Sequence, residues 1–157
     1  MRSKRIGTGA ALAAGTLAAT ALAFAPSAAA VTPQSATISA NCGIYGSGQA
    51  TLTATQTGTS ATITVSSAIS APIALGADSI TSTLTLVKAG GGTVAFTGTK
   101  NPAIAAGSPV KVGPLSGTVA SGDRLEAFGG SLQMTVFGIP ITCSATAKQS
   151  PGPFVFD

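Results

Sequence analysis

Apolar and hydroxyl-bearing side chains alternate along several short stretches of this chain. Between residues 80 and 88, for example, Thr83 and Thr85 occupy alternate positions to Leu84 and Leu86. Successive side chains of a β-strand point to opposite faces, so a period of two predicts antiparallel sheets with one buried face. Seven to nine short strands are predicted in this way, over Ala36–Cys42, Ala50–Thr57, Ser60–Ser67, Ile80–Lys88, Thr93–Thr99, Val110–Val112 with Leu115–Val119, Arg124–Phe128, Ser131–Phe137 and Ile141–Ala147.

Glycine and proline separate the predicted strands at close intervals. Gly58, the glycines at 90–92 and the stretch from Gly138 to Pro140 each lie between two predicted strands, which indicates three hairpins. Helix-favouring patterns are nearly absent after residue 30. Many short strands joined by tight turns predict a single all-β domain over residues 31–157, either a sandwich or a barrel.

The alternation also predicts which side chains form the core. Large apolar residues that share the buried faces of the strands are Leu52, Ile63, Val65, Leu84, Leu86, Val94, Phe96, Leu125, Leu132, Met134, Val136 and Ile141. Fully burying one large apolar side chain contributes about 1.5–3 kcal/mol. A dozen such residues stabilise a domain only moderately, so a covalent cross-link is an expected supplement.

Residues 1–30 have the three parts of a secretory signal peptide. Arg2, Lys4 and Arg5 give a positive start, the run over 10–25 carries no charge, and small residues follow Pro26. The apolar run is shorter than the ~20 residues that span a bilayer, which argues against a membrane anchor. We expect cleavage after Ala30 and a secreted, extracellular protein with no membrane span in its mature part.

The net charge of +4 depends mainly on the leader. Residues 31–157 contain five Lys and Arg and four Asp and Glu, so the predicted mature chain carries 5 − 4 = +1. The five cations are spread along the chain. Proteins that bind nucleic acids need a concentrated basic patch, and the sequence shows none. We therefore expect no nucleic acid partner.

Cys42 and Cys143 are the only two cysteines. Paired cysteines in an exported chain most often form a disulfide, because the compartment is oxidising. Closing a loop with a sequence separation of 143 − 42 = 101 would stabilise the fold by roughly 4–5 kcal/mol in chain-entropy models. The alternative, a metal site, usually needs four ligands, and no histidine is present to support the two sulfurs.

Three short motifs stand out beside the export leader: Asn41-Cys42-Gly43 early in the chain, the turn-rich stretch 113–118, and Ile141-Thr142-Cys143 late. With these motifs the chain resembles small secreted immunoglobulin-like proteins of uncharacterised function from high-GC Gram-positive bacteria. The resemblance implies an immunoglobulin-like antiparallel β-sandwich outside the cell, and no activity. Two features depart from true immunoglobulin domains: the chain has no tryptophan, and its cysteines are further apart than the usual inter-sheet pair.

The composition excludes several catalytic chemistries. Without histidine, neither a Ser-His-Asp set nor a His-ligated zinc site can form. Asp123 and Glu126 are three residues apart, which in a strand places them on opposite faces, so a paired-carboxylate glycosidase is not expected. Asp123 and Asp78 are interpreted as turn residues, and Glu126 as a residue of a solvated face beside a cation. The sequence predicts no enzyme, no cofactor and no metal.

Function is therefore expected to reside in surface recognition. Tyr45, the only tyrosine, lies in a glycine-rich loop beside Cys42. It is the candidate for a surface contact, and the alternative role is packing over the disulfide. We expect a monomeric binding module whose partner is an extracellular protein or a polysaccharide. The alternative is a self-assembling cell-surface protein, which low charge and Thr/Val-rich strands favour.

Overall fold

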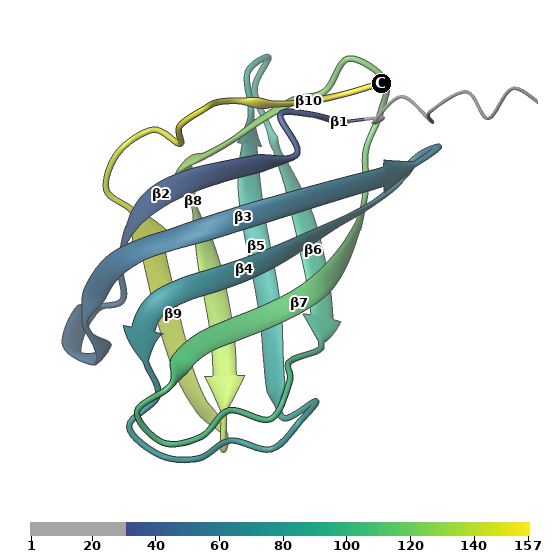
Figure 1. The fold of residues 1–157 in the computed structure, drawn as a ribbon. Helices are drawn as coiled ribbons and strands as arrows, with labels where there is room; N and C mark the ends of the chain where they lie inside the picture. The colour runs from purple at the N-terminus through teal and green to yellow at the C-terminus, as the bar shows by residue number, and fades with distance from the viewer. Residues whose placement is uncertain (1–30) are drawn as a thin grey trace, which may run out of the picture.

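The computed structural model describes residues 31–157, and the predicted signal peptide lies outside the described residues. Within them the chain forms β-strands and one short 3-10 helix, η1, and no α-helix (Figure 1). No helix in residues 31–157 has the length and apolar character needed to cross a membrane. The elements are β1 (Val31–Thr32), β2 (Ser35–Asn41), η1 (Gly43–Tyr45), β3 (Ser47–Thr57), β4 (Ser60–Ser70), β5 (Ile80–Lys88), β6 (Thr93–Thr99), β7 (Pro109–Thr118), β8 (Arg124–Val136), β9 (Ile139–Ala145) and β10 (Phe154–Phe156).

Eight of these strands close into an antiparallel barrel. Neighbouring strands follow the order β8-β5-β6-β7-β4-β3-β2-β9, and β9 pairs again with β8, which completes the ring. The short strands β1 and β10 extend the sheet beside the first part of β8. Figure 1 shows β2, β3, β4 and β7 in front of β5, β6, β8 and β9, with β1 and β10 along the upper end.

The barrel corrects the predicted immunoglobulin-like sandwich. The all-β class and the antiparallel pairing are as expected, but one closed sheet replaces two packed sheets. The physical reason is that two predicted breaks are continuous strands: β7 runs through Gly113-Pro114, and β8 runs through Gly129-Gly130. Long, bent strands can pair along both sides, so the sheet curls until its edges meet.

The predicted disulfide between Cys42 and Cys143 is confirmed, and it lies at the seam of the barrel. Strands β2 and β9 pair over only two residue pairs, Ala40 with Ala145 and Asn41 with Ser144. Cys42 and Cys143 occupy the next pair of positions in this register. The disulfide therefore joins neighbouring strands, and the covalent link reinforces one of the two shortest pairings in the ring.

A wide bulge bends β8. Ser131 and Glu126 are paired with Thr85 and Val87, so the four residues 127–130 of β8 lie opposite the single Leu86. Such an irregularity leaves backbone N–H groups without ladder partners. The half-buried carboxylate of Glu126 accepts hydrogen bonds from the backbone N–H groups of residues 127, 128 and 149, and the Gln149 side chain accepts a second one from Ala127. The interpretation of Glu126 as a solvated residue beside a cation is therefore wrong.

Candidate functional site

One end of the barrel is filled and the other is hollow. At the end near β1 and β10, the inward side chains of Phe96, Phe154 and Phe156 are fully buried and fill the interior. None of these rings lines the cavity at the opposite end. An eight-stranded barrel is just wide enough for its interior either to be filled by side chains or to hold one small ligand.

The hollow end contains a cavity of about 440 Å³ that opens to solvent. Seven of the eight barrel strands line it, all except β6. Several inward positions there carry only a methyl group, namely Ala40, Ala50, Ala127 and Ala145. Small side chains at these positions leave the interior of the barrel open, in the same way that large-to-small changes create cavities in a core.

Three predicted core residues prove to be cavity residues. Nine of the twelve predicted core side chains are buried, while Leu132, Val136 and Ile141 are only half-buried. All three line the cavity. Alternation correctly predicts that these three side chains face inward, but they face an open cavity and not a packed core.

Exposed apolar side chains form a rim at the mouth of the cavity. Six large apolar side chains are exposed in residues 31–157, and five of them also line the cavity. We call these five residues the rim: Ile44 (95% exposed), Phe137 (68%), Ile73 (53%), Ile139 (53%) and Tyr45 (40%). Grouped exposed apolar side chains commonly mark binding sites. The sixth, Phe128, lies on the β8 bulge away from the cavity.

The rim comes from three separate segments. Ile44 and Tyr45 belong to η1, and Ile73 to the loop between β4 and β5. Phe137 lies in the tight β8–β9 connection, and Ile139 is the first residue of β9. Tyr45, the predicted surface contact, therefore lies at the mouth beside the disulfide, whose two cysteines also line the cavity. Whether Tyr45 contacts a partner stays a prediction.

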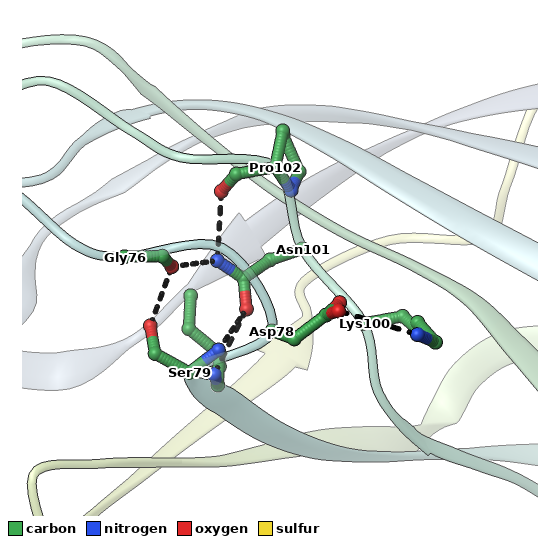
Figure 2. Close-up of polar contacts among 7 residues, drawn as sticks. Gly76, Asp78, Ser79, Lys100, Asn101 and Pro102 are labelled. Atoms are coloured by element: carbon green, nitrogen blue, oxygen red, sulfur yellow. Dashed lines mark hydrogen bonds and ion pairs between the residues drawn. The ribbon is translucent and has the colours of Figure 1, made fainter.

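Asn101 fastens the loops at the open end (Figure 2). Its side chain, 4% exposed, accepts hydrogen bonds from the backbone N–H groups of Ser79 (2.8 Å) and Ile80 (2.9 Å). It also donates to the carbonyl oxygens of Gly76 (2.7 Å) and Pro102 (2.8 Å). Leu75 and Ile104 exchange two further backbone hydrogen bonds. The loop that carries Ile73 is thus tied to the β6–β7 loop, which makes the mouth a defined structure.

Among residues 31–157, no charged side chain lines the cavity. Lys88 forms an ion pair with Asp123 (2.9 Å) near the filled end, and Lys100 forms one with Asp78 (3.3 Å) beside Asn101. The backbone N–H of Ala120, followed by the Lys88 ammonium, lowers the pKa of Asp123 from its ordinary value of 3.8. The remaining lining is apolar apart from serine hydroxyls and the phenol of Tyr45.

The candidate catalytic carboxylates do not form a site. Asp123 closes the turn before β8 by accepting a hydrogen bond from Ala120 N (2.9 Å), as its interpretation as a turn residue predicts. Asp78 also lies in a turn, with a positive φ of 51°. Glu126 is engaged by the β8 bulge. In the described part of the chain, no group of three or more His, Cys, Asp or Glu residues is placed to hold a metal ion.

The sequence contains a signal for the rim in the residue types of its connections, which hydrophobic alternation does not detect. Tight connections normally carry Gly, Asn, Asp, Ser or Pro. Here Ile139 lies in the predicted turn at 138–140, two residues after Phe137 at the end of a predicted strand, and the loop after Cys42 carries Ile44 and Tyr45. Large apolar side chains at these two connections indicate a surface that is stabilised by something other than water.

Comparison of the chain with protein-family models, with curated proteins and with solved structures finds no match. The case for function therefore depends on the geometry of the cavity and its rim.

Proposed function

We propose that this protein is a secreted, non-catalytic binding protein that holds one small apolar molecule in the hollow end of its barrel. The observation that carries the proposal is the coincidence of the cavity with the rim. A cavity lined by apolar groups and open to solvent is the usual form of a small-molecule site, and 440 Å³ lies within the usual range of 300–1,000 Å³.

The site is preformed, which favours affinity. The disulfide fixes the seam of the barrel next to η1, and the Asn101 hydrogen bonds fix the loop that carries Ile73. A ligand therefore needs to order little of the protein when it binds, and less of the interaction free energy is lost. Leaving the rim exposed costs free energy in the unliganded protein, and a ligand that covers it recovers part of that cost.

The proposal also includes export. Two cysteines joined in a disulfide are typical of an oxidising compartment. Together with the signal-like sequence of residues 1–30, the disulfide supports release outside the cell after cleavage at Ala30. N-terminal sequencing of the protein from culture medium tests this part: Val31 as the first residue is expected, and retention of the leader would contradict it.

Filling the cavity tests the binding proposal. Ala145 on β9 is half-buried and lines the cavity, so Ala145→Phe should place a ring in the open space. We expect this variant to weaken binding of the neutral fluorescent probe N-phenyl-1-naphthylamine at least tenfold, measured by the rise in probe fluorescence. Val136→Phe, at another half-buried cavity position, should have the same effect if Ala145→Phe folds poorly.

The matched control is Ala95→Phe. Ala95 is exposed on the outer face of β6, the one barrel strand that does not line the cavity. This variant adds the same ring and should leave probe affinity within about twofold of the unmodified protein. Equal affinity in all the variants would place the probe outside the barrel and overturn the proposal.

Self-assembly through exposed surface is the second candidate function. The rim is the observation that favours it, because exposed apolar side chains on two copies could cover one another. Light scattering over a range of concentrations separates the two candidates. A monomer at high concentration supports a ligand site, whereas dimers or larger species that dissociate in Phe137→Ser would support assembly.

A further inference from the structure

We infer that the cavity selects electrically neutral ligands and discriminates against anionic amphiphiles of the same length. This inference rests on the proposed function. It names the ligand class as long-chain alcohols, esters or similar uncharged apolar molecules, bound with the polar end at the mouth. Ionised fatty acids, which offer the same apolar chain, are the class that the site rejects.

The first argument is that nothing in the lining can neutralise a charge. Thirty residues line the cavity, and none is Lys, Arg, Asp, Glu or His. Backbone N–H groups in the paired parts of the lining strands belong to the barrel ladder, and Ala127 N at the β8 bulge is bonded to the side chains of Glu126 and Gln149. A carboxylate that loses part of its hydration at the mouth without a cationic partner is destabilised, whereas a hydroxyl there needs a single hydrogen bond.

The second argument is that the nearby cations are engaged or point elsewhere. Lys100 is paired with Asp78, and Lys88 is paired with Asp123 near the filled end. Lys111 lies on β7 between Val110 and Val112, which line the cavity, so its exposed side chain occupies the outer face. Neither Arg124 nor Lys148 is among the lining residues.

The third argument concerns the polar groups that are present. Ser67, Ser70, Ser131, Ser144 and Tyr45 are the hydroxyl-bearing residues of the lining. The Ser67 hydroxyl accepts one hydrogen bond, from Ile69 N (2.9 Å). Ser144 lies between Cys143 and Ala145 on β9, so its exposed side chain points to the outer face. Ser70 and Tyr45 are also exposed, and Tyr45 belongs to the rim at the mouth. Hydroxyl groups there can serve a neutral polar end of a ligand, as donor or as acceptor.

The volume sets the size of the ligand. A dry cavity of about 150 Å³ holds one benzene molecule, so 440 Å³ corresponds to about three benzene equivalents, or roughly 18 non-hydrogen atoms. A saturated chain of twelve carbons with a terminal oxygen fits within this limit. We therefore choose 1-dodecanol and dodecanoate as the probes, each kept below its own aggregation concentration.

Calorimetric titration of the two probes tests the inference. At pH 8 we expect 1-dodecanol to bind at least about thirtyfold more tightly than ionised dodecanoate. At pH 4, where most of the fatty acid is protonated, the difference should fall to about threefold. No carboxyl, amine or imidazole group of residues 31–157 lines the cavity, so affinity for 1-dodecanol should be the same at both pH values.

Tyr45 is the only tyrosine and the chain has no tryptophan, so intrinsic fluorescence reports ligand at the mouth.

A cation placed on the rim provides the matched test. Ile139→Lys adds an ammonium group at the mouth, and Thr142→Lys adds the same group at an exposed position of β9 outside the lining. We expect Ile139→Lys to raise the ratio of dodecanoate affinity to 1-dodecanol affinity at pH 8 at least fivefold, because the ammonium group favours only the anion, whereas loss of the apolar rim side chain weakens both probes. Thr142→Lys should change neither affinity by more than about twofold.

The outcomes separate the two proposals. Equal binding of both probes to the unmodified protein at pH 8 would overturn the preference for neutral ligands and leave the cavity as a binding site. Preference for dodecanoate would overturn it more strongly. Saturable binding of neither probe would contradict the proposed function itself, together with the inference that rests on it.

Discussion

Buried polar side chains in this barrel mainly serve its own backbone. Asn101 uses both of its amide donors and two acceptor positions to tie the loops at the open end. Glu126 and Gln149 satisfy N–H groups that the β8 bulge releases from the ladder. A buried N–H without a partner costs about 1–3 kcal/mol, so these residues are structural requirements of the fold.

Asp123 should make stability depend on acid pH. Because its folded-state pKa is lowered, the carboxylate stabilises the protein above the pKa of the unfolded chain, and this contribution is lost as the pH falls through the folded-state pKa. We expect Asp123→Asn to lower the free energy of unfolding by about 1 kcal/mol at pH 7, because the hydrogen bond from Ala120 N loses its charged acceptor and the Lys88 ion pair is lost. The difference from the unmodified protein should shrink below pH 4, measured by urea unfolding across pH 2.5–7.

Asp78→Asn is the control for that measurement. The Asp78–Lys100 pair is longer at 3.3 Å, and both side chains are more than half exposed. Exposed ion pairs contribute little, and asparagine tolerates the positive φ at this position. A loss at Asp78 as large as that at Asp123, or a loss at Asp123 that persists unchanged at pH 2.5, would contradict this assignment.

Residue-level pattern predicted which side chains face inward, but not how tightly they pack. Leu52, Ile63 and Phe96 are buried as expected, and so are six of the other predicted core residues. Leu132, Val136 and Ile141 satisfy the same alternation and yet line a cavity. Alternation specifies a face of a strand, whereas packing depends on what lies across the barrel, which the local sequence does not contain.

At the scale of the element, the predicted hairpins were correct and the long strands were wrongly divided. β5 and β6 have the predicted bounds, because alternation is regular and the loop between them is rich in glycine. β8 was divided at Gly129-Gly130, since paired glycines usually end a strand. Here they belong to the bulge. β1 and β10 were missed because strands of two and three residues contain too few positions to show a period.

Gly130 is the position where the β8 bulge depends on having no side chain. A Cβ atom at this position would overlap the carbonyl oxygen of Thr85 and lie 3.0 Å from its carbonyl carbon, and both are backbone atoms that cannot move aside easily. We expect Gly130→Ala to lower the free energy of unfolding by about 2 kcal/mol or more, as overpacking does. Chemical denaturation with circular dichroism measures this change.

Gly90→Ala in the β5–β6 loop is the matched control. No other atom lies within 4 Å of an added Cβ there, and its φ is not positive. The change in stability should stay within about 1 kcal/mol. Equal effects at the two glycines would show that the tight approach of β8 to β5 at Gly130 is not a feature of the protein in solution.

At the scale of the molecule, sequence pattern cannot distinguish a closed barrel from a sandwich. Inward-facing residues alternate with outward-facing ones in both architectures. What decides between them is that β9 pairs with both β8 and β2, and Cys143 is bonded to the residue that follows β2. Two cysteines in a chain with an export signal predict the bond but not the architecture. The cavity follows from the barrel, so the proposed function could not be reached before the topology was known.

The account as a whole depends on the hollow end of the barrel being occupied by a small apolar molecule. Met134 lines the cavity, and the only other methionine is Met1, in the predicted signal peptide. The exported protein labelled with ¹³C-methyl methionine should therefore give one methyl signal from the cavity, which Met134→Leu would assign. We predict that 1-dodecanol shifts this signal to saturation in the unmodified protein and not in Ala145→Phe. Binding of 1-dodecanol that leaves the Met134 methyl signal unchanged would contradict the account.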